Sequence, residues 1–283
     1  MMTKAGEGDI RRVRARLFSF WDTSREYFEK SHEGSRNLTA ERARMLKLIP
    51  RGARVLDVGC GPGENGWFLV RRRGCRYTGL DVSRTALAMG RRKYRHRNFR
   101  LVRGDMARLP FRNGSFDAVI STYAIEHLVE PARAFSEMTR IIRPGGRVIL
   151  ISPAVEFPFT VPVSYGARAS NPLWRAWYHI RKTAWDFLTW ADFSRAHFFI
   201  IRDPDVLRGK FVPDNDLTNV VSIRETRKFF LLRGLREIYR FDLDEKKEPF
   251  LKKTFKQVLR HILPPYRYAG VHLFVAFEKP AGG

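Results

Sequence analysis

The stretch Arg54 to Trp67, RVLDVGCGPGENGW, decides the fold of this 283-residue chain. Residues 53–58 form a short, mostly apolar run that contains β-branched side chains, which predicts a buried strand. A glycine-rich turn follows, and residues 65–72 have the pattern of a helix. A strand, a tight glycine turn and a helix are the elements with which α/β folds hold a nucleotide-like ligand. Glycines let the backbone approach the ligand, and the start of the helix offers free N–H groups.

The spacing of the glycines separates this loop from two common phosphate-binding motifs. The dinucleotide fingerprint needs Gly-x-Gly-x-x-Gly, whereas here Gly59, Gly61 and Gly63 alternate and Glu64 follows. No Gly-Lys-Ser/Thr sequence follows either, so the loop is not a P-loop. Asp57 precedes the first glycine by two residues, where it would repel a phosphate and attract an amino group or a sulfonium. The loop therefore indicates a cationic ligand that contains a nucleoside.

Further motifs follow this loop in a fixed order. They are the strand that ends in an acid at 77–83, the turn at 104–111, the strand at 115–122, and the turn into a strand at 142–150. With these motifs the chain resembles the class I S-adenosylmethionine (SAM)-dependent methyltransferases, and among them the small-molecule, UbiE-like type. The resemblance is strong over residues 35–152 and weak over 222–279. Several motifs in the right order are more specific than any one of them.

Strands and helices alternate along the core of the sequence, which predicts a parallel sheet with helices on both faces. The expected strands are 53–58, 76–80, 99–102, 116–121 and 146–152, and the expected helices are 65–72, 84–96 and 131–142. Together with the resemblance, this predicts an α/β fold with a Rossmann-like, seven-stranded, mostly parallel sheet and an inserted helical cap. We expect one domain over residues 1–283. Its parts are N-terminal helices at 1–50, a SAM-binding core at 51–152, the inserted cap and acceptor region at 153–221, and the C-terminal part of the sheet at 222–283.

The resemblance implies SAM as the cofactor and assigns its contacts residue by residue. Asp81, with Val82 after it, would accept hydrogen bonds from the ribose hydroxyls, since a carboxylate has two acceptor oxygens. Asp105 would accept from the adenine amine, with Met106 against the ring. Asp57 would favour the ammonium group of the methionine portion, directly or through water. The other positions near the methionine portion are Gly59, Gly61, Gly63 and Thr122. Four of these residues, Asp57, Asp81, Asp105 and Thr122, fall at the carboxyl ends of expected strands, where ligands of such sheets bind.

His127 is the candidate general base, because it follows the fourth strand on the cofactor side and imidazole titrates near neutral pH. The alternative is a histidine without a catalytic role, which many members of this family carry at the same place. No metal site is expected, since Cys60 and Cys75 are the only cysteines and form no CxxC pair.

The segments outside the core suggest where an acceptor would bind. An amphipathic helix or two is expected at 9–30, with the arginines at 11, 12, 14 and 16 on the outer, basic face, and a further helix is expected at 39–49. Tyr27 is either a lid residue or a packing anchor. In the insertion, Trp174 and Trp177 belong to an aromatic and basic helix that could wall the acceptor site, lie on a membrane surface or simply pack. A helix from 222, strands at 236–241 and 271–277, and a basic amphipathic stretch at 250–262 complete the chain.

Composition limits the partners. The net charge of +24 favours anionic company, such as nucleic acid, anionic lipid or an acidic substrate, although a general excess of arginine could also produce it. No run of apolar residues is long enough for a transmembrane helix, and the N-terminus has no secretory h-region. We therefore expect a cytoplasmic location, extended by peripheral contact with the cytoplasmic membrane face.

The function predicted from the sequence is methyl transfer from SAM, preferably to oxygen, on an apolar or lipid-linked small molecule. One alternative is an RNA methyltransferase, against which stands the absence of an Asn-Pro-Pro-Tyr-type tetrad, since residues 122–125 are Thr-Tyr-Ala-Ile. Another is a protein that binds SAM without catalysis. The sequence leaves the oligomeric state open.

Overall fold

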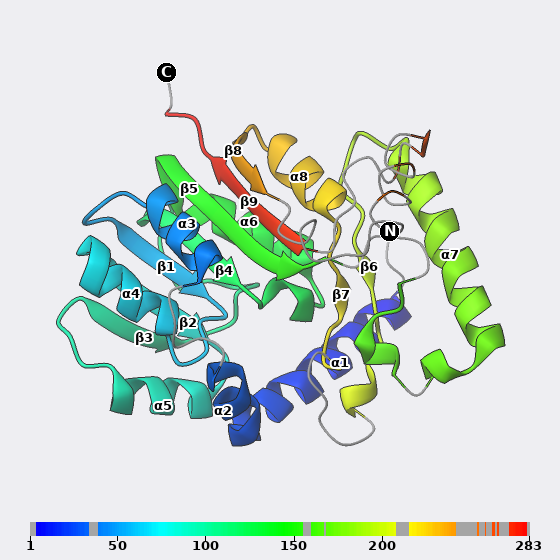
Figure 1. The fold of residues 1–283 in the computed structure, drawn as a ribbon, viewed down its shortest axis with the longest axis horizontal. Helices are drawn as coiled ribbons and strands as arrows, with labels where there is room; N and C mark the ends of the chain where they lie inside the picture. The colour runs from blue at the N-terminus through cyan, green and yellow to red at the C-terminus, as the bar shows by residue number, and fades with distance from the viewer. Residues whose placement is uncertain are drawn as a thin grey trace.

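The computed structural model describes residues 4–33, 39–154, 160–166, 168–207, 215–241 and 272–281, with the single residues 254, 258, 262, 263 and 265. The main strands are β1 (Arg54–Val58), β2 (Arg76–Asp81), β3 (Phe99–Arg103), β4 (Phe116–Thr122), β5 (Ile142–Pro153), β8 (Arg236–Phe241) and β9 (His272–Glu278). They form one seven-stranded sheet in the order β3-β2-β1-β4-β5-β9-β8 (Figure 1). The first five strands pair in parallel, whereas β9 runs antiparallel to both β5 and β8. The predicted α/β fold is therefore confirmed.

Helices cover both faces of this sheet. One face carries α6 (Pro131–Ile141) and α8 (Ile223–Leu231), which bury Phe135 and Phe230 against it. The other face carries α3 (Ala40–Leu48), α4 (Glu64–Arg73) and α5 (Arg84–Lys93), as the second hydrophobic cluster shows. Successive residues of β1 alternate between the two clusters, because side chains of a strand point to opposite faces. A sheet buried on both faces explains why the central strands β5 and β9 contain continuous apolar runs, at 148–151 and 273–277.

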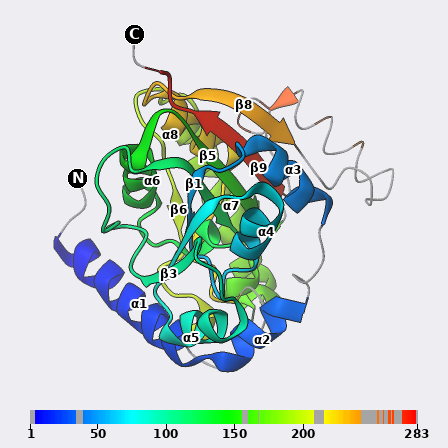
Figure 2. The same ribbon diagram turned by 90° about the vertical axis from the view of Figure 1, so that its left-hand side faces the viewer.

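The N-terminal segment forms two helices, α1 (Lys4–Thr23) and α2 (Arg25–Glu33), which are separated at Ser24. They lie next to α5 along one end of the molecule (Figure 2). Val13 and Leu17 of α1 are buried against Val129 and Val206, so this helix is packed onto the turn after β4 and onto the insertion. The sequence predicts helix over 9–30 without fixing its number of segments.

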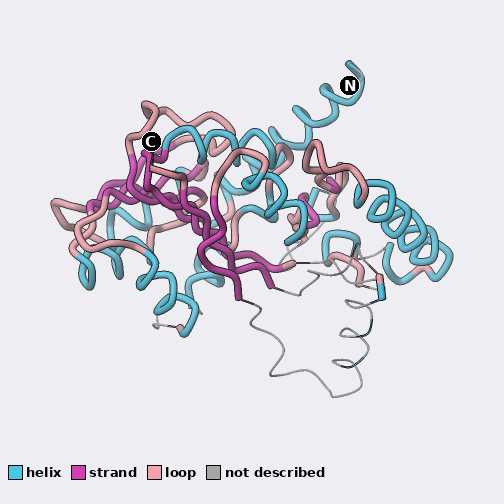
Figure 3. Tube along the Cα trace, turned by 90° about the horizontal axis from the view of Figure 1, so that it is seen from above, coloured by secondary structure: helices cyan, strands magenta, loops and turns pink. Residues whose placement is uncertain are grey.

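The insertion between β5 and α8 contains the predicted helix, α7 (Pro172–Trp190). Asn171 caps it by accepting from the Trp174 backbone N–H, and Pro172 occupies its first turn, where a missing N–H costs nothing. The insertion also holds a small antiparallel pair that the sequence does not predict, β6 (Phe199–Ile200) and β7 (Asn219–Val220). These strands lie between the main sheet and α7, which forms the outer edge of the molecule (Figures 1 and 3).

Two expectations differ from the structure, and a third lies outside it. Helix α5 ends at Lys93 rather than at residue 96, and β5 begins at Ile142 rather than near residue 146. The amphipathic stretch expected at 250–262 lies outside the described residues except for residues 254, 258 and 262. Among the described helices, none is both long and apolar enough to cross a bilayer.

Candidate functional site

A cavity of about 300 Å³ lies at the carboxyl ends of β1, β2 and β4. Its floor comes from the glycine loop and the strand ends, and α1 and α2 contribute to its wall. The sequence-predicted residues that line it are Tyr27, Gly59, Gly61, Asp81, Val82, Asp105, Met106, Thr122 and His127. The fold thus brings together side chains that are separated by a hundred residues in the sequence. Lining residues that the sequence does not single out as site residues include Arg14, Phe18, Trp21, Phe28, Arg42, Asn65, Glu126 and Glu130.

The glycine loop adopts a backbone that other residues rarely take. Gly59 has φ 71°, and a Cβ built on it would lie 2.4 Å from the Cβ of Ala124, so the loop is pressed against the turn after β4. Gly63 has φ 90°, and a Cβ built on it would lie 2.8 Å from Cζ of Phe99 in β3. Gly63 does not line the cavity, so in this structure it shapes the start of α4 instead of contacting a ligand there.

Asp81 is buried at the end of β2 and holds the glycine loop in place. Its Oδ2 accepts from the Gly61 backbone N–H at 2.8 Å, and its Oδ1 accepts from the Ser83 N–H at 2.9 Å. Burial raises the pKa of Asp81, and the backbone N–H groups of Ser83 and Gly61 counteract this. Each carboxylate oxygen keeps a second lone pair, so Asp81 can bind the loop and also accept from a ligand in the cavity.

Asp57 lies beneath the loop and does not line the cavity. Its side chain is fully buried, and its Oδ2 accepts a hydrogen bond from the Tyr77 hydroxyl at 3.0 Å. Burial raises the pKa of Asp57 to about 7. The sequence suggests that Asp57 binds the ammonium group of the ligand either directly or through water. Direct contact is not possible in this geometry, because Tyr77 and the loop lie around the carboxyl group.

The raised pKa of Asp57 predicts a pH-dependent stability. The unfolded-state pKa of an aspartate is about 3.9, so between that pH and about 7 the folded chain binds the extra proton. The contribution of Asp57 to the free energy of unfolding is present at low pH and is lost as pH rises through about 7. We expect Asp57→Asn to remove this loss, so that urea denaturation shows a smaller fall in the free energy of unfolding between pH 5 and pH 8.

Asp117 provides the matched control because its shift has the opposite sign. Burial raises its pKa, but hydrogen bonds from Arg54 and Arg143 outweigh this and lower it to about 2. Its contribution to stability is lost only as pH falls toward about 2, so Asp117→Asn should leave the slope between pH 5 and pH 8 unchanged. Equal slopes for wild type and Asp57→Asn would contradict the buried, proton-binding role of Asp57.

Arg14 links α1 to the acidic side of the cavity. Its guanidinium donates to Asp105 and, at 3.0 Å, to Glu130 Oε2. Asp105 also accepts from the Ala107 N–H at 2.9 Å. The sequence places the arginines of α1 on its outer, basic face, yet Arg14 is turned into the cavity. A ligand that hydrogen-bonds Asp105 must share this carboxylate with Arg14.

His127 lies between two buried carboxylates. Its Nδ1 is 3.3 Å from Asp216 Oδ2, and its Nε2 is 3.9 Å from Glu126 Oε1. Asp216 is fully buried, comes from the insertion, and accepts from the Trp21 indole N–H at 2.8 Å. The Trp21 ring also makes an edge contact with His127 at 5.7 Å. This arrangement connects α1, the turn after β4 and the insertion at one imidazole.

Trp174 and Trp177 do not line the cavity. Trp174 stacks on Tyr178 at 5.6 Å and contacts Tyr165 at 4.8 Å, so it belongs to a hydrophobic cluster of the insertion itself. Trp177 points outward and is exposed. The geometry therefore gives no support to the acceptor contacts predicted for these two tryptophans, because α7 packs on β6 and β7 and not over the cavity. In the described part of the chain, no group of three His, Cys, Asp or Glu residues could hold a metal ion.

Comparison with known proteins gives three kinds of match. Residues 56–150 match the family model described as "Methyltransferase domain". A phthiotriol/phenolphthiotriol dimycocerosates methyltransferase of Mycobacterium ulcerans is 36% identical over 99 residues, which are 35% of this chain and 36% of that protein. A fatty-acid O-methyltransferase of Mycolicibacterium smegmatis is 39% identical over 97 residues, 34% of this chain and 35% of that protein. The match thus spans about a third of the length of these curated relatives.

The likeness in three dimensions extends further. The crystal structure of a SAM-dependent methyltransferase from Aquifex aeolicus superposes with a TM-score of 0.54 at 14% identity, over 90% of this chain and 98% of that one. This shows that the chain shares the fold of that protein, including parts outside residues 56–150.

Proposed function

We propose that residues 56–150, which match the methyltransferase model, form a SAM-dependent methyltransferase domain of class I, and that the chain methylates an oxygen of an apolar or lipid-linked small molecule. The observation that carries the proposal is one cavity in which Asp81, Asp105 and His127 meet beside aromatic side chains.

The residues of the cavity fit SAM. The ligand is a cation with a nucleoside, and the cavity offers it the carboxyl groups of Asp81, Asp105 and Glu64. Asp81 would bind the ribose hydroxyls, while Asp105 and Met106 would bind the adenine. Gly61 lines the cavity at the turn, and a Cβ there would meet only Phe28, at 4.0 Å, so the backbone is open to the methionine portion.

Bound SAM supplies a methyl group on a sulfonium, which is already a good leaving group. The protein therefore contributes mainly alignment and exclusion of water, and alignment can supply about 7–11 kcal/mol in favourable cases. Trp21 and Phe18 of α1 line the wall of the cavity, and Trp21 ties that wall to Asp216. This contact fixes α1 beside the reacting groups.

His127 would remove the proton of an acceptor hydroxyl. A carboxylate at Nδ1, here that of Asp216, favours the tautomer with its proton on Nδ1 and leaves the Nε2 lone pair for the acceptor. Asp216 acts through His127 and is therefore a positioning residue. The sequence did not single it out, because its contact with His127 depends on how the insertion docks.

We expect His127→Gln to lower kcat by about 10²–10⁴-fold with little change in SAM affinity, because only proton removal is lost. Asp216→Asn should lower kcat less, and it should move the acid limb of the pH–rate profile to lower pH, because the carboxylate favours protonated imidazole. The measurement is transfer of label from methyl-labelled SAM into a lipid extract at a series of pH values. A profile that does not move in Asp216→Asn would assign Asp216 a structural role alone.

Two observations support the choice of acceptor. The cavity wall is aromatic where α1 and α2 contribute Phe18, Trp21, Tyr27 and Phe28. The names of the two mycobacterial relatives refer to a dimycocerosate lipid and to a fatty acid. An RNA acceptor, which the net charge of +24 suggests, and binding of SAM without transfer are the outcomes that the labelling experiment separates from this proposal.

A further inference from the structure

The aromatic run of α7 divides into two faces. Tyr178, Trp174 and Trp185 point inward, where they pack in a cluster with Phe199 of β6. A second set of large apolar side chains points to solvent. The most exposed of them are Leu173 (82%), Trp177 (52%), Ile180 (71%) and Leu188 (78%), and Phe187 and Trp190 are exposed to a smaller extent.

The four most exposed residues of this set form one continuous stripe. Positions 173, 177, 180 and 188 fall within a narrow angular range of a helix with 3.6 residues per turn, and the exposed Ala184 and Ala191 lie between and beyond them. Phe193, shortly after the helix ends, is also exposed. We call this set, Leu173, Trp177, Ile180, Ala184 and Leu188, the outward stripe. Scattered exposed apolar residues are ordinary, but an aligned set along a whole helix marks an interaction surface.

The charges beside the outward stripe are all positive. The sole acid of α7 is Asp186, which is buried and bonded to Lys182 with an Nζ–Oδ2 distance of 2.6 Å. Arg181 borders the stripe and is exposed, and its guanidinium lies 5.2 Å from the centre of the Trp177 ring, whereas the exposed Arg175 lies on the other side of the helix. The surface that α7 offers is therefore apolar and cationic at once.

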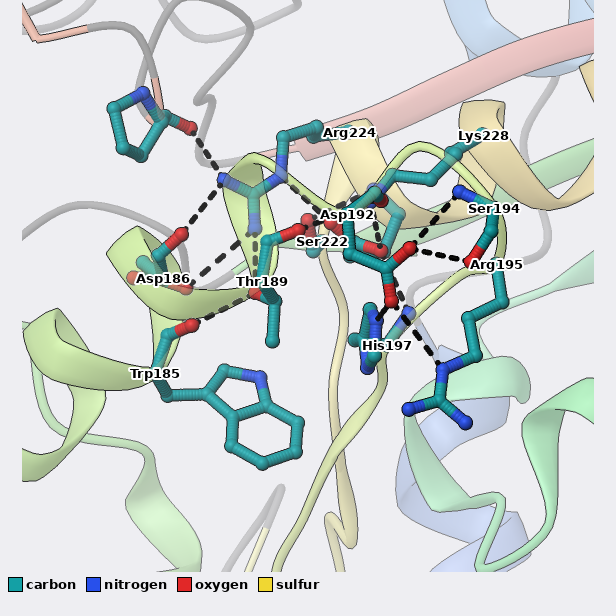
Figure 4. Close-up of polar contacts among 12 residues, drawn as sticks. Trp185, Asp186, Thr189, Asp192, Ser194, Arg195, His197, Ser222, Arg224 and Lys228 are labelled. Carbon is teal, nitrogen blue, oxygen red and sulfur yellow. Dashed lines mark hydrogen bonds and ion pairs between the residues drawn. The ribbon is translucent and has the colours of Figure 1, made fainter.

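A polar network fixes the rotation of α7, so the direction of the outward stripe is set by the fold (Figure 4). Arg224 of α8 donates to the Asp186 carbonyl at 3.3 Å and to Thr189 Oγ1 at 3.3 Å. Lys228 donates to the carbonyls of Thr189, at 3.3 Å, and Asp192, at 2.8 Å. These bonds hold the inner face of the helix against the body of the protein and leave the outward stripe facing away from it.

We propose that the outward stripe docks on an anionic lipid bilayer, with α7 lying in the plane of the interface. Apolar side chains bordered by arginine, with an indole among them, suit the boundary between headgroups and acyl chains. A second copy of this chain would bring another +24 charge to the same surface, so it is disfavoured. Nucleic acid would use the arginines but not the exposed leucines and isoleucine. The position of α7 at the outer edge lets a flat surface reach it (Figures 1 and 3).

This docking does not depend on the proposed catalysis, so it is tested by binding alone. The full chain is sedimented with vesicles of phosphatidylcholine alone and of phosphatidylcholine with phosphatidylglycerol, at low and at high salt. We expect binding to the anionic vesicles, weakened by salt. The double variant Ile180→Glu/Leu188→Glu should lower the partition coefficient by about tenfold or more, because it places two negative charges on the face of α7 that would enter the bilayer.

The matched control is Leu231→Glu/Leu232→Glu, which makes the same change of charge at exposed leucines at the end of α8. It should bind nearly as wild type does.

Brominated lipids should quench part of the wild-type tryptophan fluorescence, and Trp177→Phe should lose that part. Equal loss of binding in both double variants would assign the attraction to diffuse charge, and absence of wild-type binding to anionic vesicles would overturn the docking altogether.

Discussion

Replacing Asp81 with alanine is expected to weaken SAM binding by about a hundredfold or more. A hydrogen bond to a charged group contributes about 1.5–3 kcal/mol, and in the proposed site Asp81 would accept from both ribose hydroxyls. Loss of two such bonds amounts to about 3 kcal/mol or more, which corresponds to a factor above about 100 in Kd. The variant also removes the acceptor of the Gly61 N–H, so the glycine loop loses one of its anchors. Titration calorimetry with SAM measures the change.

Asp117→Ala is the control for this variant. Asp117 also lies on a strand of the core, but it pairs with Arg54 and Arg143 and does not line the cavity. It should keep wild-type affinity for SAM. A thermal melt of both variants separates loss of binding from loss of folding. An affinity near that of wild type in folded Asp81→Ala would contradict the placement of the cofactor at the end of β2.

Replacing Glu225 with alanine is expected to lower the free energy of unfolding by about 3 kcal/mol. Glu225 is buried and pairs with Arg224 at 2.7 Å and Lys228 at 3.2 Å, and it accepts from the His197 backbone N–H at 2.7 Å. Removing one partner of a buried pair leaves the other charges uncompensated, which costs about 3–5 kcal/mol in known cases. For a chain of this size each kcal/mol shifts Tm by about 2–4 °C, so Tm should fall by roughly 6–12 °C.

An exposed ion pair supplies the comparison. Arg25 and Glu29 are paired at 2.7 Å along α2, but both side chains are more than half exposed. Glu29→Ala should therefore cost less than about 1 kcal/mol. A loss for Glu225→Ala as small as that for Glu29→Ala would mean that the network joining α7 to α8 adds little to stability. The fixed direction of the outward stripe would then lose its support.

The features that can be predicted from the sequence are those whose signal is local. The glycine loop, the alternation of strands and helices, and the acids at the strand ends each depend on residues that are close in the chain. The structure has all seven predicted strands in one sheet, and it brings Asp81, Asp105 and His127 to one cavity. The sequence could not predict that Gly63 faces Phe99 of β3, because that contact joins distant parts of the chain.

The contacts that the sequence could not provide join distant segments. Arg14 meets Asp105 across 91 residues, and Trp21 meets Asp216 across 195. Periodicity assigns Arg14 to the basic face of a helix, but it does not say which face turns toward a cavity. For α7 the sequence likewise gives the aromatic residues and their spacing, whereas only the packing on β6 and β7 shows which tryptophans are buried.

Methyl transfer from SAM to an apolar acceptor can be measured in a single labelling experiment. The purified chain is incubated with methyl-labelled SAM and a lysate of its source organism, and the products are separated into lipid, RNA, protein and small-molecule fractions. We expect label in the lipid fraction, at a level that His127→Gln lowers by about 10²–10⁴-fold. Label confined to RNA, or no transfer to any fraction, would contradict the proposed function.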